Sequence, residues 1–530
     1  MTDVRIIQVL LGHASLASTA RYTRVATKTI SNTNGLGLPL ETISDNPIPD
    51  VVIGYVSVQG AESVFGGKAQ LQKTSKAYHA KKSDRDSVRR DLEKSGFSIL
   101  AESAVGLSVS APPGAYEEIT GGKLESKEFL RNVDADYTMY VTQLDVIGDK
   151  QPKTVGVGQV SSKNLKVDGV VIEKPRFYSA VFPSPIPATS FKFHLRVPGD
   201  VGLVLNVAPA HLLGHRGEGV LVAMPDSGQY RHPFFTANRF QLKPTIAVVP
   251  GTDPSKDPVG HGTGESANIF AVAPGAVLQA IRTSNDAGKG VGARPGFLLA
   301  KDLNPKPRII TNSWGGDLPY PPPGPPDETE LTFALEIQDA IEQGILVIFA
   351  AGNGLFSIEP QVPGVLAAGG AFMDSLGNLW ASDFASAYLS PWFDGVNVPT
   401  ISGLVGMRPR AQYIMLPVQP DCQFDREQSE IDPRVDLTTD GTLSDDGWAL
   451  FSGTSAAAPQ LAGAAALVLG AKPALTPAQV IQALVMTATD VAAGFCHPRF
   501  SNPAGPGFDI ATGAGLVNAA AAVQYAVNNF

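Results

Sequence analysis

The chain has 530 residues, of which 43% are hydrophobic, and a formal net charge of −9. This length predicts roughly two to four domains with ordinary globular composition. The acidic balance disfavours nucleic-acid binding through phosphate contacts. No apolar run approaches the ~20 residues of a membrane span, and the first 45 residues lack the apolar stretch of a secretory signal. We therefore expect no nucleic-acid or membrane partner, and a cytoplasmic protein by default, secreted only if the start is misassigned.

The first 45 residues contain a segment that is similar to another class of protein. Asp3–His13 followed by Thr19–Thr23 resembles the C-terminal end of tyrosine recombinases. The resemblance would give His13 and Tyr22 the roles of active-site histidine and DNA-cleaving nucleophile. It covers only about residues 3–30, and the arginine-bearing domain of that family cannot fit before residue 3. We interpret residues 1–45 as a non-functional remnant, with an ordinary amphipathic helix as the alternative.

Residues 46–205 have an α+β pattern. Val51–Val58 is a predicted strand, Ser83–Ser95 a charged helix, and Phe97–Leu100 and Gly106–Ser110 two further strands. The proline-rich stretch Pro183–Pro187 predicts a stiff, exposed linker near the end of this region. We expect a smaller α+β region ahead of the main domain.

Buried strands alternate with helices in residues 206–530. Gly219–Ala223, Arg308–Asn312 and Ile345–Ala350 are short apolar runs typical of buried strands. A helix between the last two begins at the carboxylate cap Asp327 and is closed by Gly344. Such alternation predicts a parallel sheet that is covered by helices on both faces.

Four polar residues lie at the ends of these elements: Asp226, His261, Asn353 and Ser455. A serine hydroxyl is a weak nucleophile and needs a neighbouring base, which an imidazole supplies near neutral pH. A carboxylate fixes the tautomer of that imidazole, and an amide stabilises the oxyanion. These residue types, in the order Asp–His–Ser, predict acyl-bond cleavage by Ser455, with His261 as base, Asp226 as its orienter and Asn353 as oxyanion donor.

Ser455 opens an alanine-rich run, which predicts a helix. We expect Pro459 in about the first turn, where its missing N–H costs little. The free N–H groups and partial positive charge of a helix N-terminus suit a developing oxyanion near Ser455.

The motifs around these residues resemble those of subtilases, the subtilisin-like serine peptidases, over about residues 206–530. The aspartate, histidine, oxyanion and serine motifs correspond to Val222–Gly228, Gly260–Thr263, Ala351–Asn353 and Gly453–Pro459. The resemblance implies a three-layer α/β fold with a parallel sheet and polypeptide substrates. It also implies that the edge segment Ser313, Trp314 and Gly315 pairs with the substrate backbone.

Two departures from the family pattern stand out. Gly264–Ile269 replaces the usual His and Val-Ala residues after the histidine motif, and Asp383–Asp446 matches the family poorly. Within the latter stretch, Cys422–Asp446 is a polar, acidic segment that we interpret as a surface insertion near the serine. A sedolisin-like acid peptidase is an alternative, because Gly507–Gly513 and the serine motif resemble that family, but it uses a glutamate where this chain has His261. A catalytically silent peptide-binding protein is the other alternative.

The resemblance also suggests roles for the remaining features. Residues 46–205 would be a prodomain that inhibits the enzyme until it is removed, or else a permanent accessory region. No organic cofactor is implied. Subtilases commonly bind structural calcium, but no acidic loop here has convincing ligand spacing. Cys422 and Cys496 are the two cysteines, and either one disulfide or two unpaired thiols would fit.

Overall fold

The computed structural model describes residues 42–43, 48–65, 74–132, 138–161, 165–178, 193–430 and 440–530. The recombinase-like segment and the proline-rich stretch 183–187 therefore lie outside the described residues.

The N-terminal region is built on a five-stranded antiparallel sheet. Its strand order is β3-β4-β2-β8-β7, with β2 at Val52–Val58, β3 at Ser98–Glu102, β4 at Gly106–Ala111, β7 at Val157–Gly158 and β8 at Val167–Ile172. The helices are η1 (Ser75–Tyr78), α3 (Lys82–Lys94) and α4 (Pro113–Thr120). A second sheet joins β1 (Thr42–Ile43), β5 (Lys123–Asn132) and β6 (Thr138–Ile147). The three strands and the helix expected here from the sequence lie within two residues of those found.

The main sheet has nine strands and is almost entirely parallel. The order is β12-β14-β11-β15-β17-β18-β19, with β13 paired to β14 and β22 to β18. Only the pair of β18 and β19 is antiparallel among these. The bounds are β11 Leu221–Asp226, β12 Gln241–Leu242, β13 Ile246–Ala247, β14 Val277–Arg282, β15 Ile309–Asn312, β17 Leu346–Ala350, β18 Leu366–Met373, β19 Leu379–Ala381 and β22 Ile401–Leu404. The three strands predicted from apolar runs correspond to β11, β15 and β17.

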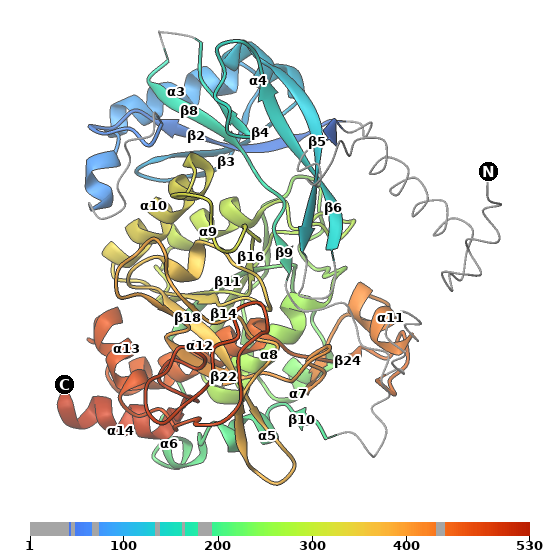
Figure 1. The fold of residues 1–530 in the computed structure, drawn as a ribbon, viewed down its shortest axis with the longest axis vertical. Coiled ribbons are helices and arrows are strands. Elements are labelled where there is room, and N and C mark those ends of the chain that lie inside the picture. Colours follow the sequence, from blue (N-terminus) through green and yellow to red (C-terminus); the bar gives the residue numbers. More distant parts are fainter. Residues whose placement is uncertain are drawn as a thin grey trace, which may run out of the picture.

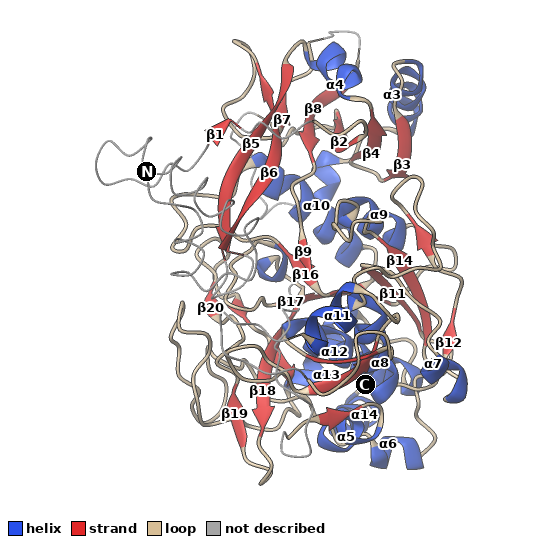
Figure 2. Cartoon of the chain, turned by 90° about the vertical axis from the view of Figure 1, so that its right-hand side faces the viewer, coloured by secondary structure: helices blue, strands red, loops and turns tan. Residues whose placement is uncertain are grey.

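Helices cover both faces of this sheet (Figures 1 and 2). In β17, Leu346 and Ile348 join the core under α8 (His261–Val272) and α12 (Thr454–Ala471). Val347 and Phe349 join the opposite core under α9 (Ala293–Lys301) and α10 (Glu328–Glu342). The alternation follows from the two-residue period of a strand. The predicted three-layer α/β arrangement is confirmed.

Local signals explain the helix ends that were predicted. The Asp327 carboxylate accepts the Glu330 N–H at 2.9 Å and so caps α10. Gly344 follows α10 with a φ of 83°, a left-handed conformation that glycine adopts without strain. The chain then enters β17 directly.

Shorter elements surround the two sheets. The remaining helices are α5 (Gly199–Val204), α6 (Ala208–Leu212), α7 (Pro233–Ala237), η2 (Glu359–Gln361), α11 (Gln423–Ser429), α13 (Pro477–Val485) and α14 (Ala519–Asn529). The remaining strands are β9 (Phe177–Tyr178), β10 (Leu195–Arg196), β16 (Trp314–Gly315), β20 (Tyr388–Leu389), β21 (Asn397–Val398), β23 (Ile414–Pro417) and β24 (Trp448–Phe451).

Helix α12 is the one helix, within the described part of the chain, that is long and apolar enough to cross a membrane by length and composition. The expectation that no apolar run approaches that length was therefore too strict. Of its 18 residues, 89% are buried inside the protein. Contacts with α8, β15, β18 and β22 make it a central helix of the main core.

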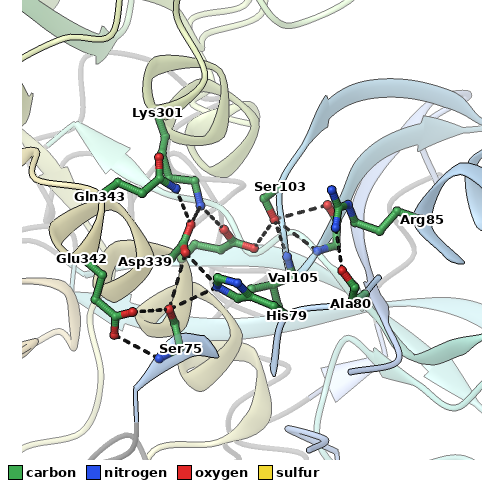
Figure 3. Close-up of polar contacts among 12 residues, drawn as sticks. Ser75, His79, Ala80, Arg85, Ser103, Val105, Lys301, Asp339, Glu342 and Gln343 are labelled. Carbon is green, nitrogen blue, oxygen red and sulfur yellow. Dashed lines mark hydrogen bonds and ion pairs between the residues drawn. The ribbon is translucent and has the colours of Figure 1, made fainter. Parts of the chain in front are cut away.

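The five-stranded sheet packs through β3 and β4 on α9, and η1 packs on α10, at one end of the molecule (Figure 1). Polar groups cross this contact around Lys301 and Asp339 (Figure 3). The Lys301 ammonium donates to Asp339 at 2.8 Å, and His79 Nε2 lies 2.9 Å from the same carboxylate. The Ser103 hydroxyl donates to Glu336 at 2.7 Å. Carboxylates of α10 are thus bound from both sides of the contact.

Candidate active site

The four residues predicted from the motifs lie at the carboxyl-end edge of the parallel strands, where α/β sheets build their sites. Asp226 ends β11, His261 begins α8, Asn353 follows β17, and Ser455 is the second residue of α12. All four side chains are buried.

Asp226 and His261 form a tight buried pair. His261 Nδ1 lies 2.6 Å from Asp226 Oδ1, so the carboxylate orients the ring. Burial alone would lower the pKa of His261, but the charge and hydrogen bond of Asp226 outweigh burial and raise that pKa. A Cβ on Gly262 would lie 2.3 Å from the carbonyl oxygen of Gly228, so only glycine lets α8 approach β11 this closely.

A residue that sequence reasoning missed, Asp257, holds the start of α8. Its Oδ1 accepts from the Ser227 hydroxyl at 2.7 Å and from the Gly260 N–H at 2.9 Å. Its Oδ2 accepts from the Thr263 N–H at 2.9 Å and the Thr263 hydroxyl at 2.7 Å. An Asp shortly before a helix is a capping signal, and here it satisfies N–H groups beside His261.

Ser455 and Ser313 exchange hydrogen bonds. The Ser455 hydroxyl donates to the Ser313 carbonyl at 3.2 Å, and the Ser313 hydroxyl donates to the Ser455 carbonyl at 2.8 Å. Pro459, four residues later, has no N–H for the Ser455 carbonyl, so that oxygen accepts from Ser313 instead. Because α12 begins at Thr454, Pro459 lies in its second turn. The prediction that Pro459 lies in about the first turn was therefore wrong, because the helix begins one residue before Ser455.

Asn353 is oriented by the residue before the serine. Its Oδ1 accepts from the Thr454 N–H at 2.9 Å and from the Thr454 hydroxyl at 3.0 Å. A Cβ on Gly453 would lie 2.8 Å from Asn353 Nδ2, and Gly453 has a φ of 125°. Glycine at 453 therefore lets the amide of Asn353 lie against the turn that carries Ser455.

Glu265 is an additional buried carboxyl beside the histidine. It follows His261 by one helical turn, and its Oε1 lies 3.8 Å from His261 Nε2. Its Oε2 accepts from Asn268 at 3.0 Å, and the Asn268 side chain accepts from Gln460 of α12 at 3.2 Å. Burial raises the pKa of Glu265 to about 8. The unusual residues after the histidine motif indicated that the helix beside His261 differs from the family pattern, but they did not predict the contact of Glu265 with His261.

The segment Cys422–Asp446 is only partly a surface insertion. Cys422, Phe424 and Asp425 are buried, and the Phe424 ring packs edge-on against His261 with centroids 5.9 Å apart. The expectation of a surface insertion was wrong for these residues, because α11 packs on β24 behind the histidine.

Both cysteines, Cys422 and Cys496, are buried free thiols. This resolves the alternative left open by the sequence in favour of two unpaired thiols. Among the described residues, no group of three or more His, Cys, Asp or Glu side chains is arranged to hold a metal ion.

The predicted substrate edge is paired with a segment of this chain. Ser313 precedes β16, and the Trp314 indole donates to the Pro225 carbonyl at 2.7 Å, which ties β16 to β11. The backbone of β16 pairs antiparallel with β9, with Trp314 opposite Tyr178 and Gly315 opposite Phe177. A strand from the N-terminal region therefore lies on the edge beside Ser455.

Comparisons with known proteins agree with this geometry. The model of the subtilase family, Peptidase S8, matches residues 217–515. The subtilisin of Bacillus pumilus is 26% identical over 332 residues, which cover 60% of this chain and 96% of that protein. Subtilisin E of Bacillus subtilis is 27% identical over 332 residues, covering 60% of this chain and 69% of the relative.

A solved structure shares the fold. Fervidolysin from Fervidobacterium pennivorans, a keratinolytic enzyme related to subtilisin, superposes with a TM-score of 0.52 at 18% identity. The match covers 91% of this chain and 62% of fervidolysin. The comparisons give no evidence for the recombinase resemblance. With a subtilisin-like α/β fold and a family match over more than half its length, this chain belongs to the subtilase family of serine peptidases.

Proposed function

We propose that the chain is a serine endopeptidase that cuts polypeptides through an acyl-enzyme intermediate. The observation that carries this proposal is the buried pair of His261 and Asp226 at the sheet edge where α12 presents Ser455. The Ser455 oxygen attacks the substrate carbonyl carbon, and its proton passes to Nε2 of His261. Asp226 holds the ring through Nδ1 and stabilises the imidazolium.

The negative oxygen of the tetrahedral intermediate is stabilised by the Asn353 amide and the Ser455 N–H at the start of α12. His261 then gives its proton to the leaving amine, which breaks the peptide bond and leaves an ester on Ser455. Water, deprotonated by His261, attacks the ester and releases the second product.

We further propose that residues 46–205 act as an intramolecular inhibitor and that residues 206–530 form the peptidase domain. The pairing of β9 with β16 supports this role, because a strand on that edge keeps a substrate backbone off it. The edge residues Ser313, Trp314 and Gly315 would then bind substrate once the N-terminal region has left.

The acid-peptidase alternative has less support. That chemistry needs a carboxyl in place of the histidine. Here the histidine is present and paired with Asp226, and Glu265 lies beside it rather than replacing it. Activity with an optimum near pH 4 would favour the alternative.

Fluorophosphonate labelling tests the proposal. We expect the wild-type chain to be labelled and Ser455→Ala not to be, while Ser429→Ala, a serine on α11, keeps its labelling. Equal labelling of Ser455→Ala and the wild type would exclude Ser455 as the nucleophile. A folded wild type that stays unlabelled after removal of its N-terminal region would favour a silent peptide-binding protein.

A further inference from the structure

Two basic side chains that precede β9 lie among carboxylates of the main domain. The Arg176 guanidinium forms an ion pair with Glu359 of η2 and lies over the Phe333 ring, 5.3 Å from its centroid. The Lys174 ammonium lies 3.1 Å from Glu330 Oε1 and 3.2 Å from Asp327 Oδ2. Arg176 is only 5% exposed, so this is a built pocket rather than a surface contact.

Without the side chains of Lys174 and Arg176, the pocket is acidic. We define it by the carboxylates of Asp327, Glu330 and Glu359, of which Glu330 and Glu359 are buried. A guanidinium of the main domain, that of Arg294, adjoins the acidic pocket and is paired at 2.7 Å with Glu173 of the N-terminal region. Without the N-terminal region the acidic pocket keeps its three carboxylates, and Arg294 loses Glu173 as its partner. Because buried carboxylates outnumber the basic side chains among the described residues of the pocket, binding of a positively charged group in it is favourable.

The acidic pocket adjoins the path of a bound strand. Gly315 pairs with Phe177 and Trp314 with Tyr178, so β9 runs toward Ser313. The Ser313 carbonyl accepts from the Ser455 hydroxyl at 3.2 Å. On its other side the backbone of Arg176 bridges to Gly290. A peptide in the place of β9 would therefore enter the acidic pocket shortly before, in the N-to-C direction, it reaches Ser455.

We infer that the acidic pocket selects the substrate: polypeptides with basic residues N-terminal to the cleaved bond, above all an Arg at the position that Arg176 takes. This inference rests on the proposed peptidase function and names its substrate class. Arg suits the position because its planar guanidinium pairs with a carboxylate and stacks on an aromatic ring at once. In the intact chain, Lys174 and Arg176 occupy the acidic pocket as a substrate would.

A peptide comparison tests the inference. The probe is a fluorescence-quenched peptide of residues 170–185, tested against versions with Gln in place of Arg176 or of Lys174. The enzyme is the protein as it is purified in active form, and mass spectrometry locates the cut. We expect loss of the Arg to lower kcat/KM by about 10- to 100-fold, the effect of one charged hydrogen-bonded pair. Equal kcat/KM for the Arg and Gln peptides, or a cut N-terminal to the Arg, would overturn the inference.

The enzyme side is tested with Glu359→Gln. This variant should cleave the Arg and Gln peptides equally, whereas Asp302→Asn, the same chemical change at the far end of α9, should keep the preference of the wild type. If Glu359→Gln does not fold, Glu330→Gln with the Lys174 peptides is the second variant. Cleavage of all peptides without a charge preference contradicts the inference alone, whereas absence of cleavage and of fluorophosphonate labelling contradicts the proposed function.

Discussion

Tyr55→Phe tests how the N-terminal region is held on α9 and α10. The Tyr55 hydroxyl of β2 donates to the Glu336 carboxylate of α10, across the contact whose other polar groups appear in Figure 3. Burial, together with the charge of Glu336, raises the pKa of Tyr55 well above its ordinary value, so the hydroxyl stays protonated and donates. The substitution removes that hydroxyl oxygen and keeps the aromatic ring, whose centroid lies 5.0 Å from the Arg294 guanidinium carbon.

The expected cost follows from what remains on Glu336. A hydrogen bond to a charged group contributes about 1.5–3 kcal/mol. Glu336 keeps the Ser103 hydroxyl at 2.7 Å and the Lys301 ammonium, so it is not left unpaired, and the lower limit applies. A cost of about 1.5 kcal/mol raises the population of the undocked state roughly tenfold.

Hydrogen exchange at one amide reports this population. The Ser75 N–H donates to Glu342 of α10 at 3.0 Å and is released when the N-terminal region undocks. In a Ser455→Ala background, which prevents self-cleavage, Tyr55→Phe should speed exchange at Ser75 about tenfold. Tyr116→Phe is the matched control, because its buried hydroxyl donates to Val52 within the N-terminal region. Exchange at Ser75 that is unchanged in Tyr55→Phe, or equally faster in Tyr116→Phe, would refute the reasoning.

Three further predictions concern the chemistry. Asn353→Ala should lower kcat by about 10²–10³, a range that comes from subtilisin itself rather than from this chain, with little change in KM; an unchanged kcat would exclude Asn353 as oxyanion donor. Because the base must be neutral and the pKa of His261 is raised, a pH–rate profile should lose activity on acidification at a midpoint above 6.5, the ordinary histidine value; a midpoint below it would contradict this. Glu265, with a pKa of about 8, is mostly neutral near pH 7, so Glu265→Gln should retain activity and leave the midpoint nearly unchanged, and a midpoint moved to lower pH would show that an ionised Glu265 acts on His261.

The sequence predicted the parts of the site that carry local signals. Asp226, Asn353 and Ser455 follow apolar strands or open a helix, so periodicity and capping chemistry located them before the structure did. The same signals explain why β15, β17 and α10 were predicted to within two residues, whereas the predicted strand Gly219–Ala223 begins two residues and ends three residues before β11. The sheet order needed tertiary information, because β12 and β13 are two-residue strands with no periodicity of their own.

Residues that act through distant contacts were not predictable in this way. Glu265 is an ordinary helical glutamate until α8 packs on β11 and α12, and Phe424 lies against His261 only because α11 folds back on β24. Arg176 and Glu359 are 183 residues apart in the chain, so no local pattern links them. Polar composition suggested a surface position for Asp425, yet its carboxylate is buried and accepts the backbone N–H groups of Asp421 and Gly447.

The composition of the contact between the N-terminal region and the peptidase domain bears on whether that region stays. Val64, Tyr78 and Val105 join the apolar core of α9 and α10. The same contact also contains the ion pair of Arg294 with Glu173 and the bonds of Glu336 and Asp339 to the N-terminal region. Replacing buried ion pairs by apolar side chains often stabilises a permanent contact, whereas two surfaces that must separate stay soluble when they keep their charges. The charged contact therefore agrees with our proposal that this region acts as an inhibitor that is removed. We expect the intact mass of the active enzyme to lack the N-terminal region, and full activity in the uncut 530-residue chain would contradict this argument.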